Sequence, residues 1–202
     1  MLSLLNPDMR QVIKKVLILS NKVLEESFKA EKIIDTIDSI IKDYGDRFEK
    51  GEVNVETIQE FARKLEVLIP KFIETIENQM VSIKDLYKYI IENTEQTGKI
   101  IGSEYVEEIS RIIKSFGKLI SIIDILEDID IILTYYSMYE EIPHRERMEY
   151  DIIKNLIRRF SLVLNDYKHF LNEVVEVIHM IKSLVSRTIL EKYIPRYKVS
   201  RK

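Results

Sequence analysis

The chain has 202 residues, of which 46% are hydrophobic and 32% are charged, and its formal net charge is −3 at pH 7. This length suits one or two domains, and the apolar content is enough to build a buried core and to disfavour intrinsic disorder. The chain contains no cysteine, which excludes disulfides, thiolate metal sites, iron–sulfur clusters and cysteine nucleophiles. The slight acidity argues against a protein whose whole surface binds nucleic acid.

Targeting signals are not evident in the sequence. The stretch MLSLLNPDMRQ has no basic segment followed by a long apolar one, and no run of about 18 uncharged apolar residues follows. We therefore expect no signal peptide, no transmembrane helix and a cytoplasmic location. The richness in Ile, Lys and Glu is typical of thermophile proteomes, so we also expect a thermophilic source, archaeal or an archaeal virus.

The first helix is predicted over residues 7–44. Asn6 suits an N-cap and Pro7 suits the first helical position. Apolar residues then recur at alternating steps of three and four, the pattern of a helix that packs against partner helices, and Glu26 is the one exception. Gly45 opens the predicted loop that follows.

The second helix is predicted over residues 55–97, with Asn54 as its N-cap. Pro70 lies inside this segment, lacks an N–H group and clashes with the preceding turn. Because the apolar stripe continues across Pro70, we expect a kink at this position.

The third and fourth helices are predicted over residues 104–140 and 143–193. Ser103 suits the N-cap of the third helix, and Asp130 interrupts its apolar stripe. The fourth helix has the most regular stripe of the four. Neither helix shows the alternating pattern of a strand or a glycine-rich phosphate loop.

Four long helices joined by short connections predict the fold class: all-α, an elongated antiparallel up-down-up-down four-helix bundle, in effect a coiled-coil-like rod. We assign residues 1–194 to one helical-bundle domain. Residues 195–202 form a basic C-terminal tail.

The two acids that interrupt the apolar stripes are predicted to share a layer. Folding the chain back about its loops places Glu26 beside about residues 72, 128 and 156, with an error of about one turn. A buried carboxylate needs a cationic partner, so we predict a buried charge layer that fixes helix register. A metal or anion site and a different register are the alternatives. The predicted layer contains Glu26, Asp130, Lys71, Lys154 and Arg158.

Two pairs of acids at four-residue spacing offer a second candidate site: Glu31 with Asp35, and Asp124 with Asp128. Helical geometry places each pair on one polar face. The spacing resembles the acidic motifs of PhoU-like phosphate-regulatory proteins, which are also all-helical and of similar length. This resemblance implies a regulator that binds metal or phosphate through carboxylates on its helices.

A catalytic site is not predicted. His144 lies in a loop, and His169 and His179 are ten residues apart, with no nucleophile motif beside them. We therefore expect a protein that is not an enzyme and that carries no cofactor.

Basic residues gather where an up-down-up-down bundle brings both termini and the second loop together. Lys and Arg interleaved with Tyr suit single-stranded nucleic acid or an anionic membrane surface, although a basic tail is also commonly just solvated. This predicted basic pole comprises Arg10, Lys14, Lys15, Lys99, Arg187, Lys192, Arg196, Lys198, Arg201 and Lys202.

The function favoured by the sequence is a non-enzymatic scaffold or adaptor that acts through protein–protein interaction. Ile125, Ile129 and Ile132 lie off the main stripe of the third helix and widen its apolar arc. An exposed patch of that kind favours a homo-oligomer or a protein partner. No small-molecule substrate is indicated.

Overall fold

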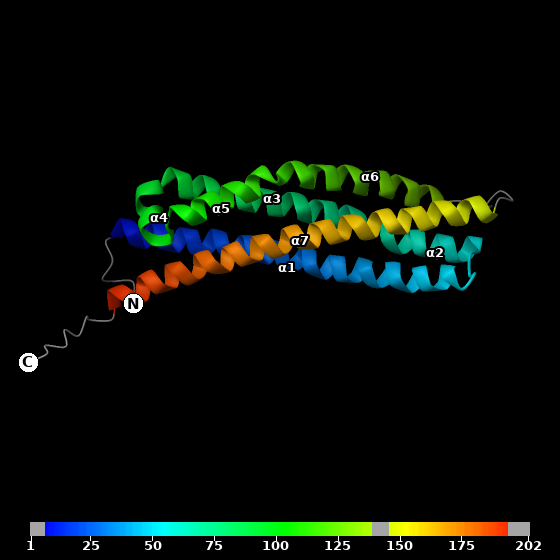
Figure 1. Ribbon diagram of the computed structural model, residues 1–202, viewed down its shortest axis with the longest axis horizontal. Coiled ribbons are helices and arrows are strands. Elements are labelled where there is room, and N and C mark those ends of the chain that lie inside the picture. Colours follow the sequence, from blue (N-terminus) through cyan, green and yellow to red (C-terminus); the bar gives the residue numbers. More distant parts are fainter. Residues whose placement is uncertain (1–6, 139–145, 194–202) are drawn as a thin grey trace, which may run out of the picture. The chain divides into compact units, whose positions relative to one another are not determined.

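The protein is helical throughout the part that the computed structural model describes, which is residues 7–138 and 146–193 (Figure 1). Helices take up 94% of these residues, and none of them forms a strand. The all-α prediction is therefore confirmed. His144, Pro143 and the tail 195–202 lie outside the described residues.

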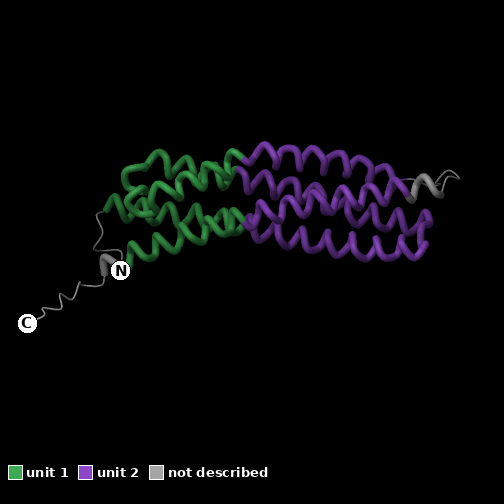
Figure 2. The backbone as a smooth tube through the Cα atoms, in the orientation of Figure 1, with its two compact units in different colours: residues 1–25, 81–114, 173–202 green, residues 26–80, 115–172 purple. Residues whose placement is uncertain are grey.

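The chain divides into two compact units, each assembled from segments that are distant in the sequence (Figure 2). Unit 1 comprises Met1–Glu25, Val81–Lys114 and Glu173–Lys202. Unit 2 comprises Glu26–Met80 and Ser115–Asn172. The sequence predicted one domain, and whether the two units act as one stays a prediction.

Helix α1 spans Pro7–Glu49 and runs through Gly45, where the sequence placed the start of a loop. The reason is packing beyond that glycine: Phe48 is buried, and its ring lies 5.7 Å from that of Phe61 and 6.0 Å from that of Tyr44. Burying a Phe contributes about 1.5–3 kcal/mol, whereas a glycine inside a helix costs about 1 kcal/mol. The helix therefore continues until its aromatic residue is buried.

The predicted second helix is split and not merely kinked. Helix α2 spans Val55–Glu66 and α3 spans Ile69–Glu92. Pro70 is the second residue of α3, where its missing N–H group is harmless, and its ring is incompatible with a helix that continues from Glu66. At the start of α2, the Asn54 side chain accepts a 2.8 Å hydrogen bond from the Thr57 backbone N–H, as the capping pattern predicted.

The end of the predicted second helix forms a helix of its own. Helix α4 spans Thr94–Ile101, and Gly102 follows with φ of 79°, a left-handed conformation that favours glycine. Helix α5 then begins at Ser103 and spans Ser103–Lys114.

The predicted third helix divides at Ser115, after which α6 spans Phe116–Met138. Its buried stripe includes Ile129, one position before Asp130 of the predicted stripe. The helix is therefore rotated relative to the prediction, and Asp130 lies half-buried at the edge of the stripe. Burying an isoleucine in place of a carboxylate is the favourable choice.

The last helix, α7, spans Glu146–Tyr193 and contributes apolar residues to both units. In unit 2, Phe160, Val163 and Tyr167 are buried, and in unit 1 Ile178, Ile181 and Val185 are buried. Their three- and four-residue spacing agrees with the regular stripe of the sequence.

The core of unit 2 contains aromatic residues around a buried polar chain. The Tyr167 ring lies 5.1 Å from the Phe72 ring and 6.0 Å from the Phe170 ring. The Tyr167 hydroxyl donates to Gln79 Oε1 at 2.5 Å, and Gln79 Nε2 donates to Ser27 Oγ at 2.8 Å. Helices α1, α3 and α7 are therefore joined by hydrogen bonds inside unit 2.

In unit 1 the end of α7 packs against α4. Thr188 Oγ1 donates to the Ile100 carbonyl at 3.3 Å, and Thr97 is buried with its hydroxyl bonded to backbone carbonyls of Ile90 and Asn93. These bonds satisfy buried polar atoms at a helix junction.

Candidate functional site

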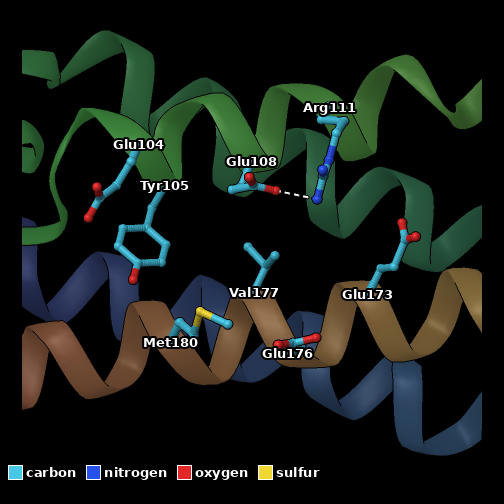
Figure 3. Close-up of a pocket in the computed structure, with 8 residues that line it drawn as sticks. All are labelled: Glu104, Tyr105, Glu108, Arg111, Glu173, Glu176, Val177 and Met180. Atoms are coloured by element: carbon cyan, nitrogen blue, oxygen red, sulfur yellow. Dashed lines mark ion pairs between the residues drawn. The ribbon is translucent and has the colours of Figure 1, made fainter.

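A cavity of about 360 Å³ opens between α5 and α7 in unit 1 (Figure 3). Tyr105 extends from α5 toward α7, and Val177 and Met180 form an apolar part of the lining on α7. Four carboxylates surround this apolar part. The acidic lining residues are Glu104, Glu108, Glu173 and Glu176.

One guanidinium offsets part of this negative charge. Arg111 Nη2 lies 2.5 Å from Glu108 Oε2, one turn along the same helix. Glu104, Glu173 and Glu176 are exposed, so the cavity carries a net negative charge and can attract a positively charged group. Sequence reasoning missed this cavity, although Glu104 with Glu108 has the same four-residue spacing as the acid pairs singled out on other helices.

The predicted buried charge layer does not form. Lys71, Lys154 and Arg158 are all exposed. Glu26 is buried, but its carboxylate pairs with Lys29 Nζ at 2.7 Å, three residues along α1. A long lysine side chain can reach back along its own helix while its ammonium stays in water, so no cation has to be buried.

A different register of the helices in unit 2 explains why the predicted charge layer does not form. The fold-back placed Glu26 beside about residues 72 and 156, whereas its neighbour Ser27 is joined through Gln79 to Tyr167. The partners lie about two turns further along α3 and about three turns further along α7 than predicted. Because α1 continues to Glu49, the chain turns back later than predicted, and the residues of the following helices lie beside later positions of α1.

Within the described residues, Asp130 forms no ion pair with a lysine or arginine. Its Oδ1 atom is buried without a hydrogen-bond partner among the described residues. Burial raises the pKa of the Asp130 carboxyl, and the nearby Glu66 carboxylate raises it further. The Glu66 carboxylate therefore repels the Asp130 carboxylate, the opposite of the predicted pairing.

The acid pairs that resemble PhoU-like motifs lie on the surface. Glu31, Asp35, Asp124 and Asp128 are all exposed. Asp128 Oδ2 lies 3.9 Å from Arg159 Nη2 of α7. Within residues 7–138 and 146–193, no group of three or more His, Asp or Glu side chains is arranged to hold a metal ion.

The described members of the predicted basic pole belong to unit 1. Lys14, Lys15, Lys99 and Arg187 are exposed and Arg10 is half-buried. Lys99 pairs with Glu95 at 2.8 Å, so part of its charge is neutralised locally. The side chain of Lys192 and residues 196–202 lie outside the described part, so the basic pole stays a prediction.

The apolar surface predicted for the third helix is not formed by the predicted residues. Ile129 is fully buried in unit 2, and Ile125 and Ile132 are half-buried. The exposed apolar residues of α6 are instead Ile120, Ile131, Tyr135 and Met138. Ile131 and Met138 are 69% and 73% exposed, which is far outside the range of core residues.

Among the described residues, no helix is both long enough and apolar enough to cross a membrane.

No protein-family model matches the chain, and no curated protein or solved structure is significantly similar to it. Function is therefore inferred from the residues and their surroundings.

Proposed function

We propose that this protein is a non-enzymatic helical scaffold that acts through protein–protein contacts and forms homo-oligomers. The observation that carries this proposal is the row of exposed apolar side chains on α6. Ile131, Tyr135 and Met138 are separated by four and three residues, so they lie together on one side of the helix, and Ile120 lies on the same side beyond the exposed acids Asp124 and Glu127. That side is opposite the stripe that packs into unit 2.

An exposed apolar row needs a function because water disfavours it. Burial of apolar surface contributes about 25 cal/mol per Å², and large exposed apolar patches are uncommon on monomers. Scattered exposed apolar residues such as Val67 and Val81 are ordinary, whereas four on one face of one helix are not. A protein surface is the covering that suits Ile, Tyr and Met together.

The finer architecture is part of the proposal: within each unit the helical stretches form an antiparallel four-helix bundle. In unit 2, Arg47 pairs with Glu60 and Ser27 lies one hydrogen bond from Gln79, so positions rise on one helix as they fall on the other. Such pairing is expected of antiparallel neighbours. A single coiled-coil-like rod stays a prediction.

Light scattering of the purified protein tests the scaffold function. We expect the mass of a dimer or higher oligomer at micromolar concentration. Ile131→Lys should shift the mass toward the monomer, because it places a charge within the apolar row. Val81→Lys is the matched control, since Val81 is 52% exposed in unit 1 and lies outside the row. A monomeric wild-type protein would contradict self-association.

A second function, binding of an anionic partner at the basic residues of unit 1, is favoured by one contact. The hydrogen bond from Thr188 to the Ile100 carbonyl joins α7 to α4, which brings the neighbouring Arg187 and Lys99 to one region. Lys and Arg grouped in this way attract nucleic acid or anionic lipid headgroups.

A further inference from the structure

Helices α6 and α7 lie side by side in unit 2 and run in opposite directions. Two contacts fix their relative heights: Arg159 Nη2 lies 3.9 Å from Asp128 Oδ2, and the Phe116 and Phe170 rings are 6.4 Å apart. As residue numbers rise on α6, the residues beside them on α7 fall. Tyr135 follows Asp128 by seven residues on α6, and Ile152 precedes Arg159 by seven residues on α7. Tyr135 and Ile152 therefore lie at the same height.

Around the Asp128–Arg159 pair, the exposed charges of these two helices differ in sign. On α6 the exposed acids Asp124, Glu127 and Asp128 follow one another, whereas α7 presents Arg158 and Arg159. The Asp128–Arg159 pair is more than half exposed on both sides. Each of these two charges can therefore accept a second partner from outside.

We propose that this outer face of α6 and α7, carried by Asp128, Arg159, Ile131, Tyr135 and Ile152, binds the same face of a second copy of the chain through a two-fold axis parallel to the helices. The inference rests on the proposed scaffold function and names the partner of its apolar row. A rotation about this axis keeps every residue at its own height and places α6 of each copy over α7 of the other.

This arrangement is favoured by charge. Asp128 of each copy meets Arg159 of the other, so two carboxylates and two guanidiniums alternate around the axis. The other two-fold arrangement, with the axis across the helices, sets α6 over α6. The acids of one copy would then face the acids of the other, and like charges at an interface are unfavourable.

The apolar residues and the available area also suit a second copy. Tyr135 of each copy comes over Ile152 of the other, both contacts lie at the same height on one side of the charged centre, and the neighbouring Ile131 extends them. Helix α6 is about 35 Å long, and two helices present a width of about 20 Å, which gives roughly 700 Å² for each copy. A standard stable interface buries about 800 Å² for each partner.

Charge reversal tests this pairing in the full chain. Asp128→Arg and Arg159→Asp should each weaken self-association by about 10- to 100-fold, because either change puts like charges against each other at two symmetric places. An equimolar mixture of the two variants should recover the dimer as a mixed pair, since each copy then meets opposite charge on the other. The double variant Asp128→Arg/Arg159→Asp should also dimerise. Analytical ultracentrifugation with one variant fluorescently labelled measures all four.

The control is Lys22→Glu, which reverses one member of the Lys22–Asp85 pair of unit 1, a 3.5 Å ion pair whose two side chains are about half exposed. This variant should keep the wild-type mass, and circular dichroism should show that every variant stays helical, because exposed ion pairs contribute only about 0–1 kcal/mol.

The outcomes separate the two proposals. If the wild-type protein dimerises and the reversals leave the dimer unchanged, the face is wrong and the inference is overturned while the scaffold function stands. If the wild-type protein is a monomer, the inference and the homo-oligomer of the proposed function are both overturned. Recovery of the dimer in the mixture supports the inference, because two variants that had failed to fold could not form a dimer when mixed.

Discussion

Single side chains in unit 2 show how strongly burial decides the role of a polar group. Gln79 is fully buried and both ends of its amide are bonded, one to the Tyr167 hydroxyl and the other to Ser27. Burial raises the pKa of Tyr167, and the Glu26 carboxylate raises it further, so the phenol stays protonated and remains a donor. Asp130, by contrast, is half-buried with an oxygen that has no bonded partner among the described residues.

Removing the Tyr167 hydroxyl should destabilise the protein. Tyr167→Phe leaves Gln79 Oε1 buried without its donor, and an unsatisfied buried acceptor costs about 1–3 kcal/mol. Urea unfolding followed by circular dichroism measures the loss. Tyr87→Phe is the control, because the Tyr87 side chain in α3 of unit 1 is only half-buried and lies outside this buried chain. Equal midpoints for wild type and Tyr167→Phe would show that the buried chain contributes nothing to stability.

Removing the charge of Asp130 should stabilise the protein at neutral pH. The raised pKa means that the folded state holds the proton of Asp130 more tightly than the unfolded state, so ionisation opposes folding. Asp130→Asn should therefore raise the free energy of unfolding at pH 7, by up to about 1 kcal/mol. The advantage should shrink as the pH falls through the raised pKa toward the ordinary value of 3.8, where the wild-type carboxyl is protonated as well. Thermal unfolding at pH 7 and pH 3.5 tests the sign, and a less stable variant at pH 7 would contradict it.

At the scale of helices, the ends are set by competition between local preference and packing. Gly45 is a poor helix residue, yet α1 continues through it because Phe48 finds a place in the core of unit 2. Pro70 does the reverse: apolar residues lie on both sides of it, but the helix breaks between Glu66 and Ile69. Packing can outweigh about 1 kcal/mol for a glycine, whereas an internal proline costs about 3 kcal/mol and removes a hydrogen bond.

Replacing Pro70 by alanine should join α2 and α3. The new N–H group at position 70 can donate to the Glu66 carbonyl, so amide hydrogen exchange should slow around residues 67–70. Stability should change little, because the new hydrogen bond contributes about 0.5–1.5 kcal/mol and the lost rigidity of proline costs about 0.4–1 kcal/mol.

The break at Ser115 serves as the internal control, because no proline causes it and its exchange should stay as in the wild type. Fast exchange that persists around residues 67–70 in Pro70→Ala would show that packing, and not the proline ring, breaks the helix.

For the molecule as a whole, charge is distributed by region although the net charge is only −3. Unit 1 carries the acidic cavity between α5 and α7 and also the exposed bases Lys14, Lys15 and Lys99. Unit 2 carries the face of α6 and α7, where acids and bases lie on neighbouring helices. Contacts with partners are therefore expected to depend on which region is presented.

Deleting residues 195–202 tests binding of an anionic partner. The deletion removes Arg196, Lys198, Arg201 and Lys202 together with Tyr197, and leaves α7 intact, so the helical content should not change. Affinity for single-stranded DNA, RNA or anionic liposomes should fall, and its salt dependence should flatten because fewer counterions are released. Fluorescence anisotropy measures binding to the nucleic acids, and liposome flotation measures binding to the membranes.

A full-length variant with the same four bases changed to Gln is the matched control for chain length. It should behave like the deletion if charge is responsible. No affinity for any of these ligands at low salt, or an unchanged salt slope after the deletion, would remove the anionic-partner function.

The sequence by itself determined that the protein is all-α, because helical periodicity is local: the four- and three-residue steps between Val12, Val16 and Leu19 can be seen without knowing what these residues contact. It also identified Asn54 as a cap, and it located the disruption at Pro70 although it predicted a kink where the helix is split, since both effects act within one turn.

Only the tertiary structure decided which residues meet. Because α1 extends past Gly45, α3 and α7 are displaced along α1 by two to three helical turns relative to the prediction. Ser27 therefore contacts α3 and α7 through hydrogen bonds, and the predicted layer of cations does not form there. The break at Ser115 separates α5 from α6, and the buried stripe that follows on α6 takes in Ile129 and leaves Asp130 at its edge. Register and helix rotation are decided by the summed burial of many side chains across several helices. A small error in the predicted position of one loop therefore changes the predicted neighbours of every residue that follows.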